Sequence, residues 1–257
     1  MCWSGEASAA IAVGGFTSAY LLKRKGEPKE IYLTPAYFVL MEALQAVTYI
    51  VVDECDNSYN VLLTQLGILH ISFQPFFINM LAMEFVDPKV KERIKNYIYV
   101  ICGVAALLCV MRLLPMWDML GRCQLGTPMC SHIQTCAYRG EWHIGWEVLL
   151  NGFNEGWKWY WFTIFLIPVV YGSWKLSLYH YVVGPFLASL TTTNDVGEAP
   201  AVWCLFSSCI IALLLNSRLR DYIYVKSWFT WKYLRKPEEK GYAQPDASPR
   251  RHESSSD

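Results

Sequence analysis

The sequence predicts an all-α membrane protein: a polytopic bundle of seven transmembrane helices, with its N-terminus outside and its C-terminal tail in the cytoplasm. Three observations predict this fold class: apolar stretches of membrane-spanning length, a one-sided distribution of Lys and Arg, and cysteines that avoid the basic loops. The 257 residues are 54% hydrophobic and 17% charged, whereas soluble domains carry roughly 25% charged residues. The net charge of +0 gives no support for a nucleic-acid partner.

The expected spans are apolar stretches near ~20 residues, the length that crosses a hydrocarbon core of about 30 Å. The first four cover residues 6–22, 31–52, 59–86 and 94–116, and the last covers 200–216. Between them, the long stretch 157–190 is interrupted by Gly172-Ser173-Trp174-Lys175, which predicts two short helices. One continuous helix over 157–183, which would give six spans in total, is the rival interpretation.

The basic residues of the loops decide between six and seven spans. Seven spans place eighteen of the 22 Lys and Arg residues on one side of the membrane, nine of them in the C-terminal tail. Six spans would place those nine on the side opposite the rest. Because short cytoplasmic loops carry an excess of Lys and Arg, the distribution favours seven spans and a cytoplasmic tail.

The cysteines indicate the same topology independently. None of the nine falls in a predicted inner loop, and Cys2 and four others fall on the predicted outer side. Disulfides persist on the oxidising side of a membrane, so those four are disulfide candidates: Cys55, Cys123, Cys130 and Cys136. Three of them lie in the outer loop at 117–143, and an odd number leaves Cys55 or Cys2 as an expected outside partner. The pairing itself stays open.

The chain divides into a transmembrane domain over 1–220 and two C-terminal segments. Residues 221–235 mix aromatic and basic side chains, which is typical of an interfacial helix on an anionic inner leaflet. A solvated basic tail that only sets the orientation is the alternative. Residues 236–257 are rich in Pro, Ser and charge and are expected to be disordered. No signal-peptide pattern precedes Lys23, so the first span is expected to remain in the protein.

The candidate functional site consists of polar residues inside the spans, because ionisable groups at that depth are costly and default to function. Glu42 and Gln45 lie three apart on one face of the second span, and His70 and Gln74 lie four apart in the third. At a rise of ~1.5 Å per residue, Glu42 and His70 both lie ~16 Å deep. The equal depth predicts a hydrogen-bonded acid–imidazole pair. A purely structural interhelical pair is the alternative.

A metal centre is a second hypothesis for the same residues. His180 in the sixth span could join His70 and Glu42 as ligands of a transition metal such as zinc, iron or copper. The sequence contains no tight ligand motif such as H-E-x-x-H. Packing of His180 without a ligand role is an equally good interpretation.

A second polar cluster is expected at the outer rim. If residues 141–151 form a helix, His143 and Glu147 share one face with Asn151, and this helix could cover the mouth of the bundle. Cys2 and Glu6 would lie at the same rim. An ordinary interfacial helix and a disulfide-bonded Cys2 are the simpler interpretations.

Known seven-helix families fit poorly. The last span contains no Schiff-base lysine, and the Asp-Arg-Tyr and Asn-Pro-x-x-Tyr motifs of rhodopsin-like receptors do not occur. Seven-helix lipid hydrolases share the topology, but their His-x-x-x-His pair is missing, since His180 is followed at that spacing by Gly184. The opening Met1-Cys2-Trp3-Ser4 resembles a family of uncharacterised membrane proteins whose chains begin Met-Cys-Trp/Phe-Ser. That resemblance covers about eight residues and implies fold and location, not activity.

Three functions are compatible with these features. The first is a membrane enzyme, metal-assisted or not, acting on a lipid or other hydrophobic small molecule, with His70 as ligand or acid/base and Glu42 as its partner. The second is a proton-coupled transporter or channel in which the same residues relay protons. The third is a seven-helix ligand-binding sensor. All three place the protein in a lipid bilayer.

Overall fold

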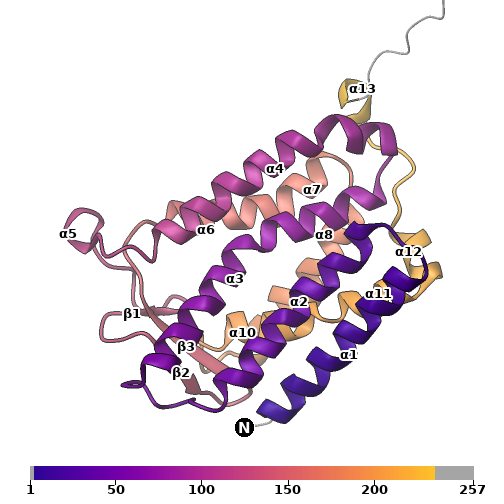
Figure 1. Cartoon of the computed structure of the whole chain (residues 1–257). Coiled ribbons are helices and arrows are strands. Elements are labelled where there is room, and N and C mark those ends of the chain that lie inside the picture. The colour runs from indigo at the N-terminus through magenta and orange to yellow at the C-terminus, as the bar shows by residue number, and fades with distance from the viewer. Residues whose placement is uncertain (1–2, 235–257) are drawn as a thin grey trace, which may run out of the picture.

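The computed structural model describes residues 3–234, which form a mostly helical molecule with a small sheet at one end (Figure 1). Two expectations lie outside these residues: the role of Cys2 and the disorder of the tail at 236–257.

The first half of the chain folds into four long helices. They are α1 (Gly5–Arg24), α2 (Lys29–Thr48), α3 (Ser58–Ala82) with a 3₁₀ turn η1 (Met83–Phe85), and α4 (Pro88–Met111). Polar side chains start three of them, because the first N–H groups of a helix need acceptors. Ser4 accepts from the N–H of Ala7, Asn57 from Tyr59 and Asp87 from Lys89.

Three helices are long and apolar enough to cross a membrane: α2, α3 together with η1, and α4. A fourth qualifies if the segment 199–215, which holds α10 (Ala199–Ser207) and α11 (Ile210–Leu215), is joined to α12 (Ser217–Ile223) across a bend of 103°. The bend lies at Asn216, whose side chain accepts from the first N–H groups of α12.

The second half of the chain is more broken. Helix α6 (Glu155–Trp161) continues through a π-helical segment η2 (Phe162–Leu166) into α7 (Ile167–Val170). Helix α8 (Trp174–Tyr181) continues through η3 (Val182–Phe186) into α9 (Leu187–Thr191). Between α7 and α8 the chain turns at Gly172, whose φ of +107° favours glycine. The predicted interruption is therefore present, and two helices form here instead of one continuous helix.

The sheet corrects the expectation of an all-α protein. Its strands are β1 (Cys130–Ser131), β2 (Cys136–Arg139) and β3 (Ile144–Leu149), in the order β1-β3-β2. Strand β3 pairs antiparallel with β2 and parallel with β1. The helix expected over 141–151 is thus wrong. From Trp146 onward, buried Trp146 and Val148 alternate with half-buried Glu147 and Leu149, the period of two that a strand shows.

Two disulfides confirm the four predicted candidates. Cys55, in the loop between α2 and α3, is bonded to Cys136 of β2, and Cys123 is bonded to Cys130. The short helix α5 (Trp117–Leu120) precedes the second bridge. The first disulfide therefore holds the sheet to the loop between α2 and α3, and the second closes a short loop that leads into β1.

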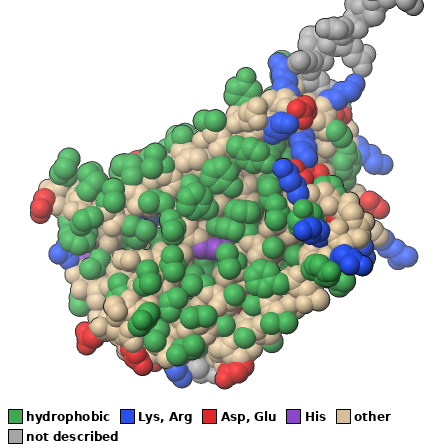
Figure 2. All heavy atoms as spheres, in the orientation of Figure 1, with side chains coloured by type: hydrophobic (Ala, Val, Ile, Leu, Met, Phe, Trp, Pro, Cys, Tyr) green, Lys and Arg blue, Asp and Glu red, His purple; other side chains and the backbone are tan. Residues whose placement is uncertain are grey.

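The two ends of the molecule differ in character. The N-terminal end of α1 lies at the sheet end, whereas α12 and α13 (Trp231–Leu234) lie at the opposite end (Figure 1). Figure 2 shows Lys and Arg side chains gathered at that opposite end, with a broad apolar surface between the two ends. Between the ends, α1 packs on α2, α2 on α3, α3 on α4 and α4 on α6, and α10 packs on both η3 and α2.

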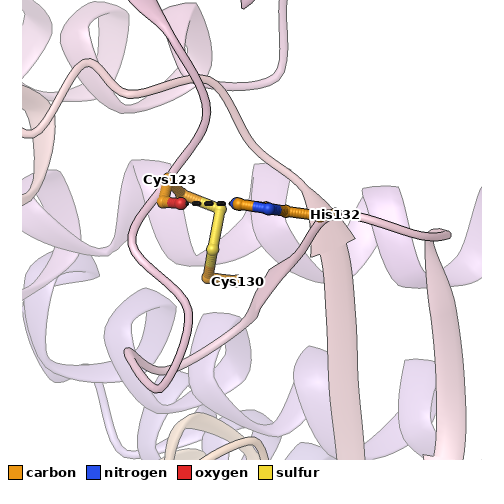
Figure 3. A group of neighbouring side chains, drawn as sticks. All are labelled: Cys123, Cys130 and His132. Carbon is orange, nitrogen blue, oxygen red and sulfur yellow. Dashed lines mark hydrogen bonds between the residues drawn. A yellow bond between two sulfur atoms is a disulfide. The ribbon is translucent and has the colours of Figure 1, made fainter.

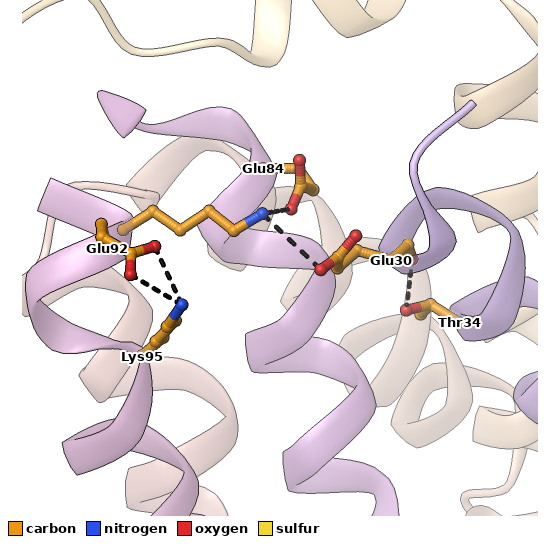
Figure 4. Close-up of polar contacts among 6 residues, drawn as sticks. Glu30, Thr34, Glu84, Glu92 and Lys95 are labelled. Atoms are coloured by element: carbon orange, nitrogen blue, oxygen red, sulfur yellow. Dashed lines mark hydrogen bonds and ion pairs between the residues drawn. The ribbon is translucent and has the colours of Figure 1, made fainter. Parts of the chain in front are cut away.

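Ion pairs tie helix ends together at the basic end. Lys91 of α4 bonds to Glu84 of η1 and lies 3.7 Å from Glu30 of α2, while Lys95 bonds to Glu92 on α4 itself (Figure 4). Arg220 of α12 pairs with Glu27 at 2.8 Å. Four carboxylates at this end are therefore already engaged by lysine or arginine.

Candidate functional site

The interior of the helical bundle holds the predicted acid, Glu42. Helix α2 buries both Glu42 (0% exposed) and Gln45 (1% exposed), so the two face the interior as their spacing predicts. Neither the carboxylate oxygens of Glu42 nor the amide atoms of Gln45 have a hydrogen-bond partner among the described residues. Buried polar groups in proteins are almost always satisfied, so these two are conspicuous. Ser8 of α1, itself fully buried, approaches the carboxylate.

His70 does not meet Glu42 in the way equal depth suggested. The described residues contain no hydrogen bond between them, and Nε2 of His70 has no partner. Its ring stacks on Tyr37, with centroids 4.0 Å apart, and the Tyr37 hydroxyl donates to the His70 carbonyl. Equal depth along two spans does not determine the direction in which their side chains point, and the His70 ring contacts Tyr37 and not Glu42.

The surface beside His70 is an apolar groove between α2 and α3. It has a volume of about 570 Å³ and is lined by His70 together with Tyr37, Phe73 and aliphatic side chains of both helices. Figure 2 shows histidine atoms in the middle of a broad apolar face. His70 thus lies at the boundary between the bundle and its surroundings, whereas Glu42 lies inside.

Gln74 connects three helices in the interior. Its Oε1 accepts from the hydroxyl of Tyr160 on α6 at 2.5 Å, and its Nε2 lies 3.5 Å from Sγ of Cys204 on α10. Toward the basic end, Asn79 continues the polar contacts: it donates to the Thr163 carbonyl and accepts from the Tyr171 hydroxyl. Buried polar side chains therefore follow one another along the inner side of α3.

His180 of α8 forms a separate buried group. Its Nε2 lies 3.5 Å from Nε1 of Trp203 and 3.4 Å from Oγ of Ser207, and its Nδ1 has no partner in the described part of the chain. Ligand atoms of Glu42, His70 and His180 do not come together as a group able to share one metal ion. Within residues 3–234, the group of three that does come together is Cys123, Cys130 and His132.

That group is already engaged in other bonds. Cys123 and Cys130 form a disulfide, and Nε2 of His132 lies 2.7 Å from the Cys123 carbonyl (Figure 3). Metal-binding cysteines act as thiolates, so this group could take a metal such as zinc only after reduction.

At the sheet end, the predicted rim residue His143 is buried, with 1% exposure, and not part of an exposed helix. Its Nδ1 lies 3.1 Å from the Tyr49 hydroxyl and accepts from the N–H of Ile144. Burial lowers the pKa of His143 to about 3, so the ring is neutral at physiological pH. Glu147 is half-buried and accepts from Gln134.

A polar cleft opens beside this cluster. It has a volume of about 510 Å³ and lies between the start of α1 and the end of α2, lined by Ser4, Gly5, Glu6, Ala9, Ala46, Tyr49, Ile50 and Arg139. The predicted rim residue Glu6 therefore lies at the cleft, and Tyr49 connects it to His143.

Glu198, at the start of α10, was not predicted and organises this end. Its buried carboxylate accepts the N–H groups of three successive residues: Glu141, Trp142 and His143. A Cβ at Gly140 would collide with the Glu198 side chain, so glycine is required there. Because the two segments are more than fifty residues apart, no local pattern in the sequence indicates the contact.

Comparison with known proteins shows one relationship. The model of a family of unknown function (DUF5765) matches residues 6–224. No curated protein and no solved structure matches the chain.

Proposed function

We propose that this chain, which belongs to that family of unknown function, is a seven-span membrane protein that conducts protons through an interior relay centred on Glu42. The observation that carries the proposal is the fully buried Glu42 carboxylate, which forms an ion pair with no cationic side chain among the described residues and has the Ser8 hydroxyl beside it. An uncompensated charge at such a site costs several kcal/mol. Charge on Glu42 therefore requires an accompanying cation, and a proton is the simplest one.

The lengths and ends of the helical segments support seven spans. Besides the three long helices, α1 has 20 residues, and the segments 155–170, 174–191 and 199–215 are continuous or nearly so. At ~1.5 Å per residue the shortest of them reaches ~24 Å, close to the thickness of the hydrocarbon core. An odd number of crossings also accounts for the start of α1 and the end of the described chain at opposite ends (Figure 1). The basic end would face the cytoplasm.

A relay needs polar groups on both sides of Glu42. Toward the sheet end, Tyr49 lines the polar cleft, and the Ser8 hydroxyl lies beside the carboxylate. Toward the basic end, Gln74 with Tyr160 and Asn79 with Tyr171 continue the sequence of polar groups. Tyr160 and His180 are each followed closely by a π-helical segment, a feature frequent at functional sites.

One feature favours this hypothesis over metal-assisted catalysis. The ligand atoms of Glu42, His70 and His180 are spread over separate places, so the described residues offer no shared metal position in the interior. A relay needs no such position.

Proton flux into proteoliposomes tests the proposal directly. A potassium gradient with valinomycin drives protons, and a trapped pH-sensitive dye reports them. We expect wild-type protein to conduct above empty liposomes and Glu42→Gln to fall to the empty level. Glu147→Gln, which alters a half-buried carboxylate of the sheet, is the matched control and should conduct normally. Wild-type flux equal to that of empty liposomes, or full flux in Glu42→Gln, would refute the relay.

A further inference from the structure

A second groove lies at the basic end, between α8 and the α11–α12 bend. Its volume is about 370 Å³, within the range of ligand sites. The walls are almost entirely apolar, including Leu178, Val182, Leu213 and Ile223. One charged side chain, Lys175, lies among the lining residues.

Lys175 has capacity for an anionic ligand. Its ammonium donates to the carbonyls of Tyr222 at 2.6 Å and Tyr224 at 3.4 Å, and it lies 4.9 Å from the centroid of the Tyr222 ring. An ammonium group has three N–H donors, so at least one remains. No carboxylate among the described residues forms an ion pair with Lys175.

The surroundings add positive charge and interfacial aromatic side chains. Four carboxylates of this end are occupied by Lys91, Lys95 and Arg220. Lys226 is exposed, as are large parts of Tyr222 (72%) and Phe229 (69%). Aromatic and basic residues together are typical of the boundary between lipid headgroups and hydrocarbon.

We propose that this groove binds one phospholipid with an anionic headgroup, whose acyl chain lies along α8 and whose phosphate contacts Lys175. Charge complementarity selects this occupant: the walls suit an acyl chain, and the one charged lining group is cationic. The proposal rests on the membrane location argued under Proposed function. A helix of another protein would need no phosphate and would bind regardless of lipid headgroup.

Native mass spectrometry of the purified full-length chain, released from detergent with added lipid, tests the site. The probes are phosphatidylglycerol and phosphatidylcholine with identical acyl chains. One lysine contact to an anionic lipid is worth about fivefold in affinity. We therefore expect about fivefold preference for phosphatidylglycerol in wild type, no preference in Lys175→Gln, and loss of both lipids in Leu178→Trp, which fills the groove.

Matched controls separate the site from general effects. Lys25→Gln removes an exposed charge from the loop after α1, and Leu107→Trp enlarges an exposed side chain on α4; both should behave as wild type. Equal retention of both lipids by wild type would overturn the proposal, as would an equal loss in Lys25→Gln or undiminished binding in Leu178→Trp. Thermal unfolding verifies that each variant is folded. Because the assay uses no proton gradient, absent proton flux with a retained lipid preference would refute the relay alone.

Discussion

Gly172, at the turn between α7 and α8, offers a quantitative test of the break that divides the fifth and sixth helical segments. At its φ of +107°, an L side chain costs roughly 1–2 kcal/mol. A Cβ would also lie 2.9 Å from Nε1 of Trp231 and 3.0 Å from Cβ of Trp228. Displacing Trp231 endangers its hydrogen bond to the Tyr171 carbonyl, worth about 1 kcal/mol. Gly172→Ala should therefore cost roughly 2–3 kcal/mol.

Thermal unfolding in detergent measures this cost. For a chain of this size, 1 kcal/mol shifts Tm by roughly 2–4 °C, so Gly172→Ala should lower Tm by roughly 5–10 °C. Gly14→Ala is the matched control, because Gly14 lies inside α1 with open space around its Cβ position. There alanine favours the helix by about 1 kcal/mol, and Tm should not fall. An unchanged Tm in Gly172→Ala would show that the chain does not turn at this glycine, and the division into two helices would lose its support.

Three further predictions concern the sheet end. Glu198→Ala should destabilise the protein by at least about 2 kcal/mol, because three N–H groups lose a charged acceptor, whereas Glu147→Ala should change Tm little. Because the pKa of His143 is about 3 in the folded protein and about 6.5 in the unfolded chain, the unfolded chain binds a proton at higher pH. The free energy of unfolding should therefore fall by about 2 kcal/mol between pH 7 and pH 5. His143→Phe should lack this contribution, and an identical pH dependence of stability in the variant would contradict the prediction. Maleimide labelling of denatured protein should reach four cysteines only after reduction, and earlier labelling of any of them would contradict the bridges: Cys55, Cys123, Cys130 and Cys136.

Much of the helical framework could be predicted because its signals are local. Apolar length located α2 and α3, and the Gly172 interruption located the break before α8. The disulfide candidates were predicted only from the position of these cysteines on the expected oxidising side of the membrane. These features depend on residues close together in the chain, or on which side of a membrane a loop lies.

The remaining features depend on contacts between distant segments. His143 and Glu147 are four residues apart, a spacing that places two residues on one face of a helix and also on one face of a strand. The segment forms a strand because β3 pairs with β2. Glu42 was correctly expected inside the bundle, but the stacking of His70 on Tyr37 depends on how α2 and α3 are rotated against each other. The carboxylate of Glu198 reaches a loop more than fifty residues earlier. The periodicity of neighbouring residues predicts none of these three features.

The contrast between the unbroken early helices and the interrupted later ones has a consequence for how the protein is made. Helices α2, α3 and α4 are each long and apolar enough to cross a membrane as single continuous helices, although α2 contains Pro35 and α3 contains Pro75. The later segments are shorter and are interrupted by π-helical stretches, so they depend more on contacts with neighbouring helices. If the chain is inserted into a bilayer as proposed, the first half would be placed there during synthesis before the second emerges, and would serve as the surface on which the second half assembles.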